Sequence, residues 1–316
     1  MLEFSKMERE IKLRRFAKYA WFVLAYNVLV ILWGVFLRAS KSGDGCGQYW
    51  LTCHGEVIPS APELKTLIEF SHRVMSALDG LIVIALVIWA FRLFPKNDVL
   101  RKFAVASFAL VLFEGLLGAG LVLTGNTAGS YSASRPFWAM GHLISTFVLL
   151  TAMTLTAWYA SGGKVVSLKV PGKNLLLLSI GVVGIFLVGM SGSLAALSNM
   201  LFPSQSLAEG IAKDFSETSH FLLRLRISHP ILSVATSVYL FFLSIWISRK
   251  TQDGWTKKFA GYLALLLIIQ VIFGSLTLVM LAPIVMQIGH LLLADLIWIC
   301  FVLMWAGFLA EEQNLE

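Results

Sequence analysis

The strongest constraint in the sequence is a series of eight long apolar runs. Each is long enough to cross a hydrocarbon layer of about 30 Å as a helix. Backbone N–H and C=O groups have no water partner inside a bilayer, and the alternating pattern of a membrane β-barrel is absent, so only helices remain. We therefore expect an all-α, polytopic membrane protein with eight transmembrane helices, at residues 19–38, 66–93, 102–124, 136–160, 174–198, 219–248, 257–281 and 284–309.

The distribution of Lys and Arg predicts how these helices are oriented. The N-terminal segment and the loops 92–102, 161–173 and 249–258 hold 17 of the 25 basic residues. Short loops rich in Lys and Arg stay in the cytoplasm. Both termini should therefore be cytoplasmic, in a cell membrane, with a site on the outer face. The first run lacks a small-residue cleavage site, so we expect no cleaved signal peptide. The net charge of +7 follows from this topology and does not indicate nucleic-acid binding.

The two halves of the chain resemble each other. Ser71-His72 recurs as Ser228-His229 at a shift of 157 residues, and Gly141-His142 recurs as Gly289-His290. Four helices per half make each half begin on the same side of the membrane, so the repeat is parallel. We expect two four-helix bundles, formed by residues 1–165 and 166–316.

Four histidines occupy matching places in this repeat: His72, His142, His229 and His290. Each lies early in an even-numbered run, so all four should lie at one depth near the outer face. Two imidazoles facing each other across a bundle are the axial ligands of a six-coordinate haem. A single membrane histidine could equally make an interhelical hydrogen bond. Four at matched depth favour a cofactor, and a bare zinc or copper ion would need more ligands close by.

One carboxylate distinguishes the halves. Glu69 lies three residues before His72 on the same helix face, and its counterpart is Arg226. A carboxylate can accept a proton, whereas an arginine cannot act as a base. We infer that the first half carries out chemistry and the second half carries electrons. The alternative for Glu69 is a structural salt bridge with Arg73 or Lys65.

Other polar residues of the apolar runs and outer loops have both a functional and a structural interpretation. Outer basic residues near the histidines could hold haem propionates, or could simply reach the lipid headgroups; the candidates are Arg73, Arg135, Arg224 and Arg226. The carboxylates within apolar runs are proton-path or packing residues, and we assign no function to Asp79, Glu114 and Asp295.

Two of the three cysteines are expected to form a disulfide. Cys46 and Cys53 lie in the first outer loop, on an oxidising face of the membrane. The disulfide could be a structural staple or a redox-active pair close to Glu69. Cys300 is alone in the eighth run and should only pack.

Taken together, these motifs resemble the haem A synthases of the bacterial type. Residues 38–46 read Arg-Ala-Ser-Lys-Ser-Gly-Asp-Gly-Cys and precede Trp50 and Cys53, which is similar to the family's Arg-x-Thr-x-Ser-Gly…Cys-Pro-x-Trp-Pro-x-Cys motif. Further matches are Glu69-x-x-His72-Arg73, Gly118, Gly141-His142-Leu143, His229, Gln270-x-x-x-Gly274 and Gly289-His290. The chain departs from the family in three ways. In the first outer loop, Asp44 closely precedes the first cysteine, and Gln48-Tyr49 replaces the expected Pro-containing stretch. The loop 199–218 lacks a second cysteine pair, and Glu114 stands where Gln is expected.

The resemblance implies a membrane oxidoreductase that converts the C8 methyl of haem O to a formyl group by successive hydroxylations, giving haem A for cytochrome oxidase. His72 and His142 would bind the substrate haem, with Glu69 as the catalytic carboxylate. His229 and His290 would hold a permanent haem b. Haem O synthase and an electron donor are the implied partners, beside membrane lipid, and a homo-oligomer is compatible with the sequence.

Two other classes of protein remain as alternatives. A bis-His cytochrome b in a quinol-linked complex would carry electrons without chemistry of its own. It would be expected to place histidine pairs near both leaflets, unlike this sequence. A transporter built from the repeat is less favoured, because the Gly/Pro-interrupted helices of a central site are missing.

Overall fold

The computed structural model of the protein describes residues 2–128, 130, 132–164, 166 and 171–312. This part of the chain is helical, apart from loops and one isolated bridge between Cys53 and Glu56. Its helices are α1 (Leu2–Ala39), α2 (Leu64–Leu93), α3 (Val99–Leu123), α4 (Arg135–Ala160), α5 (Gly172–Leu201), α6 (Leu207–Phe215), α7 (Phe221–Arg226), α8 (Ser228–Lys250), α9 (Gly254–Val279) and α10 (Ile284–Glu312).

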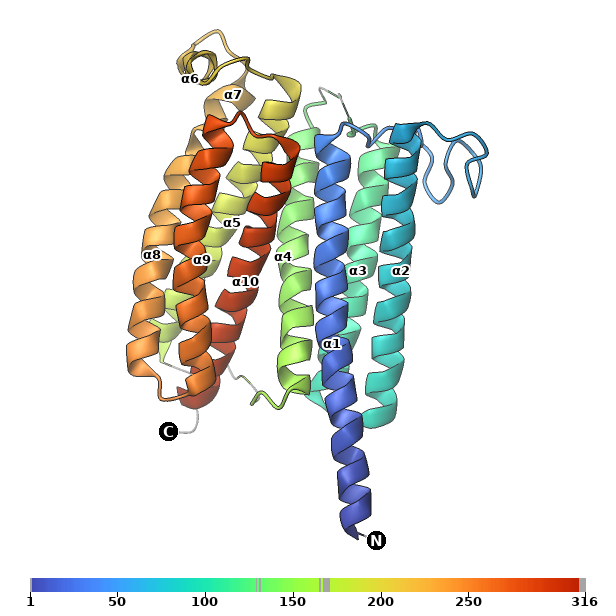
Figure 1. The fold of residues 1–316 in the computed structure, drawn as a ribbon, viewed down its shortest axis with the longest axis vertical. Coiled ribbons are helices and arrows are strands. Elements are labelled where there is room, and N and C mark those ends of the chain that lie inside the picture. Colours follow the sequence, from blue (N-terminus) through green and yellow to red (C-terminus); the bar gives the residue numbers. More distant parts are fainter. Residues whose placement is uncertain (1, 129, 131, 165, 167–170, 313–316) are drawn as a thin grey trace.

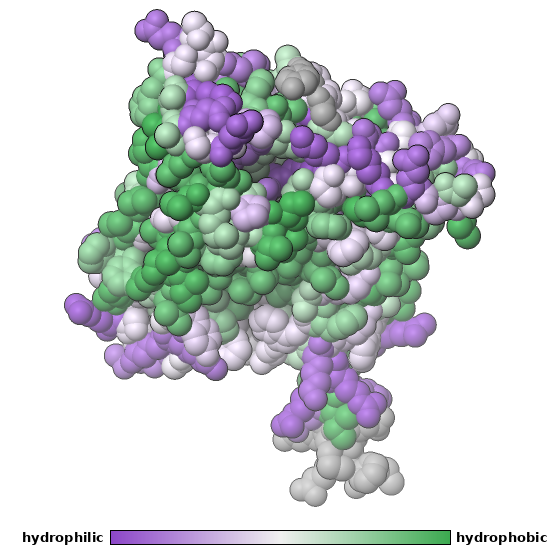
Figure 2. All heavy atoms as spheres, turned by 45° about the horizontal axis from the view of Figure 1, so that its top comes forward, coloured by the Kyte–Doolittle hydropathy of each residue, from purple (hydrophilic) through white to green (hydrophobic). Residues whose placement is uncertain are grey.

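The predicted all-α membrane architecture is confirmed. Within the described residues, eight spans are long and apolar enough to cross a membrane, with α7 and α8 together forming one of them. Figure 2 shows apolar residues as a band across the middle of the visible face, between polar residues at the two ends. Such a band is the surface that lipid chains cover. The chain is therefore a multi-pass membrane protein.

The helices form two groups that lie side by side (Figure 1). One group contains α1 to α4, which pack in the order α1–α2–α3–α4 with α4 returning to α1. The other contains α5 and α8 to α10, in which α8 packs on α5 and α9, and α9 packs on α10. This arrangement accords with two bundles, although the exact boundary stays a prediction. Residues 165 and 167–170, where that boundary was expected, lie outside the described residues.

The centre of the molecule is built by α4 and α10, which pack on each other and are mostly buried. The ring of Trp298 lies 5.4 Å from that of Phe147, measured between ring centres, and its Nε1 donates to the Phe147 carbonyl at 2.7 Å. Aromatic pairs of this kind contribute about 0.5–1.5 kcal/mol beyond the area they bury. This contact fixes the two groups of helices against each other, and with them the histidines of α4 and α10.

The outer segment before α8 contains structure that the sequence analysis did not predict. Residues 199–218 were expected to form a loop, but they contain α6, and the sixth apolar run is divided at Ile227 into α7 and α8. Ser206 caps α6 by accepting from the Glu209 N–H at 3.2 Å, and Glu209 accepts from the Gln205 N–H at 2.7 Å. A Ser followed three residues later by Glu is a known helix-start signal.

Candidate functional site

The four predicted histidines line a single cavity that runs through both groups of helices. Its volume is about 1820 Å³. Each histidine lies in the first third of its span, so all four are close to the same end of the molecule. Pockets for drug-sized ligands usually measure about 300–1,000 Å³. The cavity therefore has room for more than one large ligand.

The second histidine pair has the spacing of two ligands on one metal ion. The ring centres of His229 and His290 lie 6.2 Å apart, with the rings nearly perpendicular at 88°. A metal–imidazole bond is about 2 Å long, so imidazoles on opposite sides of one ion have ring centres roughly 6 Å apart. The residues of this pair therefore fit a haem iron between them.

Three of the histidine rings rest against a glycine of the preceding span. A Cβ atom on these glycines would lie 3.1, 2.9 and 2.8 Å from the Cε1 atom of the ring; the pairs are Gly34 with His72, Gly192 with His229 and Gly274 with His290. Each ring thus occupies the space left by the missing side chain of a glycine, and we call this space a glycine cradle. The sequence analysis singled out Gly274 but missed Gly34 and Gly192. Gly34 and Gly192 lie at matching places in the first span of each half, and this repeat could have identified them from the sequence.

The ring nitrogens of these histidines are in different surroundings. The Nδ1 atoms of His72, His142 and His290 make no hydrogen bond among the described residues. That of His229 lies 3.2 Å from the Val188 carbonyl oxygen. That of His142 lies 2.5 Å from Oε2 of Glu114 in α3. A ring whose Nδ1 faces a protein oxygen keeps Nε2 for a metal.

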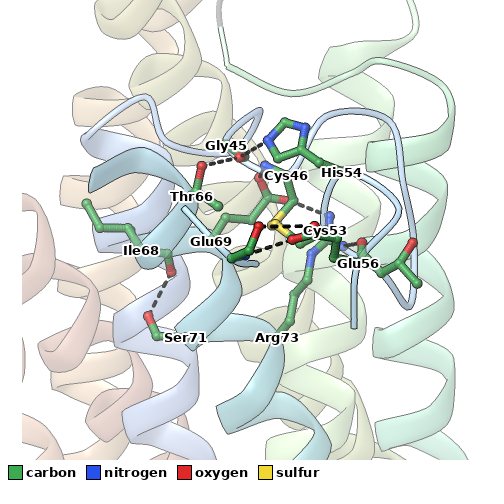
Figure 3. Close-up of a disulfide and its surroundings, with 12 residues drawn as sticks. Gly45, Cys46, Cys53, His54, Glu56, Thr66, Ile68, Glu69, Ser71 and Arg73 are labelled. Atoms are coloured by element: carbon green, nitrogen blue, oxygen red, sulfur yellow. Dashed lines mark hydrogen bonds and ion pairs between the residues drawn. A yellow bond between two sulfur atoms is a disulfide. The ribbon is translucent and has the colours of Figure 1, made fainter. Parts of the chain in front are cut away.

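Glu69 is buried beneath the first outer loop, where the disulfide lies (Figure 3). Its carboxylate accepts hydrogen bonds from the Cys46 N–H at 2.8 Å and from the Arg73 guanidinium at 2.5 Å. Arg73 also donates to the Thr52 carbonyl at 2.8 Å. The predicted Cys46–Cys53 disulfide is confirmed. Glu69 and Arg73 thus both bind the disulfide loop. The Glu69–Arg73 salt bridge, considered above as the structural alternative, is also present.

The close fit of this loop on α2 depends on Gly45. A Cβ atom there would lie 2.3 Å from the Lys65 carbonyl oxygen. The Gly45 carbonyl accepts from the Thr66 hydroxyl at 2.6 Å and lies 2.8 Å from Nε2 of His54. Main-chain contacts of this kind leave no pattern in a single sequence, which is why the Cys46–Glu69 link was missed.

The four arginines proposed for propionates differ in their surroundings. Arg73 is held by Glu69, and Arg226 by Asp214 and by the Asn199 side chain at 2.8 Å. Arg224 is exposed and is not among the residues that line the cavity. The propionate contacts therefore stay a prediction for all four.

Arg135 differs from these, because it is only 5% exposed and lines the cavity. Arg38 lines the cavity as well, and it was missing from the candidates. Within the described residues, neither guanidinium is paired with a carboxylate. These two arginines are the cavity-lining cations whose charge is least neutralised by the protein.

The two buried aspartates also face the cavity. Asp79 accepts a hydrogen bond from Asn27 at 2.8 Å. Asp295 is fully buried, and neither of its carboxylate oxygens has a partner among the described residues.

A comparison with known families decides the relationship. The model of the COX15-CtaA family, described as "Cytochrome oxidase assembly protein", matches residues 17–302. The chain belongs to the COX15-CtaA family. The match runs from α1 to α10 and includes all four histidines, Glu69 and the disulfide.

Individual relatives of this COX15-CtaA chain carry two different names. A "Heme A synthase" of Shouchella clausii is 28% identical over 287 residues, which are 88% of this chain and 92% of that protein. Another "Heme A synthase", of Halalkalibacterium halodurans, is 38% identical over 137 residues, 43% of this chain and 44% of that protein. The resemblance inferred from the sequence motifs is confirmed by these relatives and by the family match.

A "Protoheme IX farnesyltransferase" of Thermus thermophilus is 44% identical over 288 residues. The match covers 91% of this chain but 47% of that protein, so the COX15-CtaA chain spans about half the length of this relative. More than half of the Thermus protein has no counterpart here. Its name can therefore describe an activity of the part that is not shared.

Proposed function

We propose that this COX15-CtaA chain is a haem A synthase, which oxidises the C8 methyl of haem O to a formyl group and yields haem A for cytochrome oxidase. The observation that carries the proposal is the asymmetry of the two histidine pairs. Glu69 is a buried carboxylate that lines the cavity beside the first pair, whereas the corresponding Arg226 is held by Asp214. The match to a relative named heme A synthase, over 88% of this chain and 92% of that protein, supports the same reaction.

In this proposal the two halves hold different haems. His72 and His142 bind haem O as substrate, and His229 and His290 bind haem b. When bound, haem b supplies one-electron chemistry. The perpendicular His229–His290 pair with its glycine contacts supports a tightly held group. Arg38 and Arg135 are the cations best placed to balance propionate charge in the first half.

Glu69 acts as the proton acceptor of the reaction. Each hydroxylation is a two-electron oxidation of a C–H bond to C–OH. With water as the source of the oxygen atom, it releases two protons, of which Glu69 accepts one and solvent the other, and two electrons, which would leave through the second half to an external electron acceptor. Loss of water from the doubly hydroxylated carbon leaves the formyl group. The Cys46 N–H and the Arg73 guanidinium hold the carboxylate in place. Because the disulfide loop covers Glu69, it also limits the access of water from the outer face.

The membrane orientation and the partners belong to the same proposal. Both termini lie in the cytoplasm, and the site faces the outer side of the cytoplasmic membrane. A haem O synthase provides the substrate. The farnesyltransferase name of the Thermus relative is consistent with this, since transfer of a farnesyl group to protoheme is the class of reaction that makes a prenylated haem.

The proposal is tested by producing the chain in a host that makes haem O but no haem A, and by analysing the extracted pigments. We expect haem A to accumulate in membranes that contain the chain and to be missing from those that contain the Glu69→Gln variant. Purified protein that carries haem b alone, with no haem A formed in membranes that contain haem O, would show an electron-carrying cytochrome b instead.

A further inference from the structure

Glu114 is a carboxylate of α3 that the reaction described above does not use. Its Oε2 atom lies 2.5 Å from Nδ1 of His142. Its other oxygen accepts from the hydroxyl of Ser145 and, at 3.4 Å, from that of Thr146. Those two hydroxyls also bond to the His142 carbonyl, at 2.9 and 2.8 Å. One turn of α4 therefore holds the carboxylate against the ring of its own histidine.

The second half has no equivalent of this contact. The residue that corresponds to Glu114 is Gln270, whose Nε2 donates to the His290 carbonyl at 3.1 Å rather than to its ring. Within the described residues, the Nδ1 of His290 and the Oε1 of Gln270 both lack a partner. The Nδ1 of His229 faces a neutral backbone carbonyl. The histidine pair of the second half thus has only neutral neighbours at its ring nitrogens.

The two arrangements have different effects on a bound iron. The contact between Glu114 and the Nδ1 of His142 has the distance of an ion pair but not the geometry of a hydrogen bond. A carboxylate this close to the Nδ1 of a ligating histidine raises the basicity of its Nε2. A contact of this kind with an axial ligand is one of the means by which a protein sets a haem potential. The negative charge of Glu114 also favours the more positive, ferric iron.

From these contacts we propose that Glu114 is a positioning residue, which makes His142 a stronger donor than any ligand of the second half and holds the first-half haem at the lower midpoint potential. The inference rests on the proposed function only in placing a haem between His72 and His142. It goes beyond the family resemblance, because Gln is the residue expected at this position.

The test uses the purified full-length chain loaded with haem b in both halves, and follows the reduction of the two haems in an optical redox titration. In the Glu114→Gln variant, we expect the lower of the two waves to move upward by at least tenfold in its reduction equilibrium constant, which is about 59 mV for one electron. The higher wave should stay in place. Glutamine keeps the size of the side chain, so a change of packing alone would not shift one wave selectively.

The matched control is the reciprocal variant Gln270→Glu, which places a carboxylate near His290. We expect it to move the higher wave downward and to leave the lower one unchanged. The pair of variants also shows which wave belongs to which half. A Glu114→Gln titration in which neither wave moves, or both move equally, would overturn the inference, as would a first half that binds no haem b.

The outcome of the redox titration is independent of whether the protein forms haem A. Shifts as expected in a protein that forms no haem A would leave the inference standing and remove the synthase proposal. Formation of haem A together with an unmoved lower wave would do the opposite.

Discussion

At the scale of single residues, Glu69 shows how hydrogen bonds stabilise a buried carboxylate in a membrane protein. It is only 2% exposed, yet it accepts hydrogen bonds from the Cys46 N–H and from Arg73. A buried carboxylate without such partners would cost several kcal/mol. The arginine and the backbone N–H therefore allow a carboxylate, which we propose as the proton acceptor, to lie buried beside the first histidine pair.

Replacing Glu69 with Gln should reduce the conversion of haem O at least about 100-fold, because positioned acid–base groups typically contribute 10²–10⁴-fold. Haem b should stay bound in the second half. The matched control is Glu56→Gln, since Glu56 is an exposed carboxylate of the same loop that bonds only to Ser60 in the described structure. Equal activities of the two variants in a pigment assay would remove Glu69 from the mechanism.

The glycine cradles give a second prediction at this scale. A Cβ atom on Gly192 would lie 2.9 Å from the ring of His229, so Gly192→Ala should displace the ring and lower the haem b content. Gly261→Ala in α9 is the control, because nothing lies within 4 Å of that position. Removing an exposed helical glycine should even stabilise the helix by about 0.5–1 kcal/mol. A normal haem b spectrum in both variants would contradict the account of the cradle.

At the scale of elements, the first outer loop lies over Glu69 and is fastened to α2 by hydrogen bonds. The Cys46–Cys53 disulfide closes the loop, and the Cys46 N–H bonds to Glu69. In the chain-entropy model, a disulfide that closes so short a loop stabilises the folded state by about 2–3 kcal/mol, because it restricts the unfolded chain. Loss of the disulfide should therefore release the carboxylate as well as the loop.

We expect the Cys46→Ser, Cys53→Ser double variant to lose most of its haem O conversion and to keep haem b in the second half. Cys300→Ala is the control, because Cys300 is a free thiol far along the chain in α10. If the double variant converts haem O at the normal rate, the disulfide is a staple without influence on Glu69.

The outer helix α6 is held by Arg226. This arginine contacts Asp214, the Gly210 carbonyl at 2.8 Å and Asn199 of α5 at 2.8 Å. Arg226→Ala leaves Asp214 unpaired, so local stability should fall by about 1–3 kcal/mol. Hydrogen exchange of residues 207–215 should become faster, while the exposed Arg224→Ala leaves it unchanged. Slow exchange in both variants would show that α6 is held by its apolar residues instead.

At the scale of the whole molecule, apolar length and the internal repeat are long-range patterns that a sequence shows. They predicted the eight spans and singled out four histidines that line one cavity, whose ligand roles stay a prediction. These patterns missed α6 and the break at Ile227, since both depend on short polar signals in an outer segment. They also missed the Cys46–Glu69 contact and the cradles of Gly34 and Gly192. Those depend on which main-chain atoms and helix faces meet, and a single sequence does not contain that information.

The central claim is that the first half is the reaction site and the second half holds a permanent haem b. Pigment analysis of purified His72→Ala and His229→Ala variants, from a host that supplies haem O, tests it most directly. The account predicts that His229→Ala loses haem b, and that His72→Ala keeps haem b but contains neither haem O nor haem A. Loss of haem b from His72→Ala, with haem b retained in His229→Ala, would contradict it.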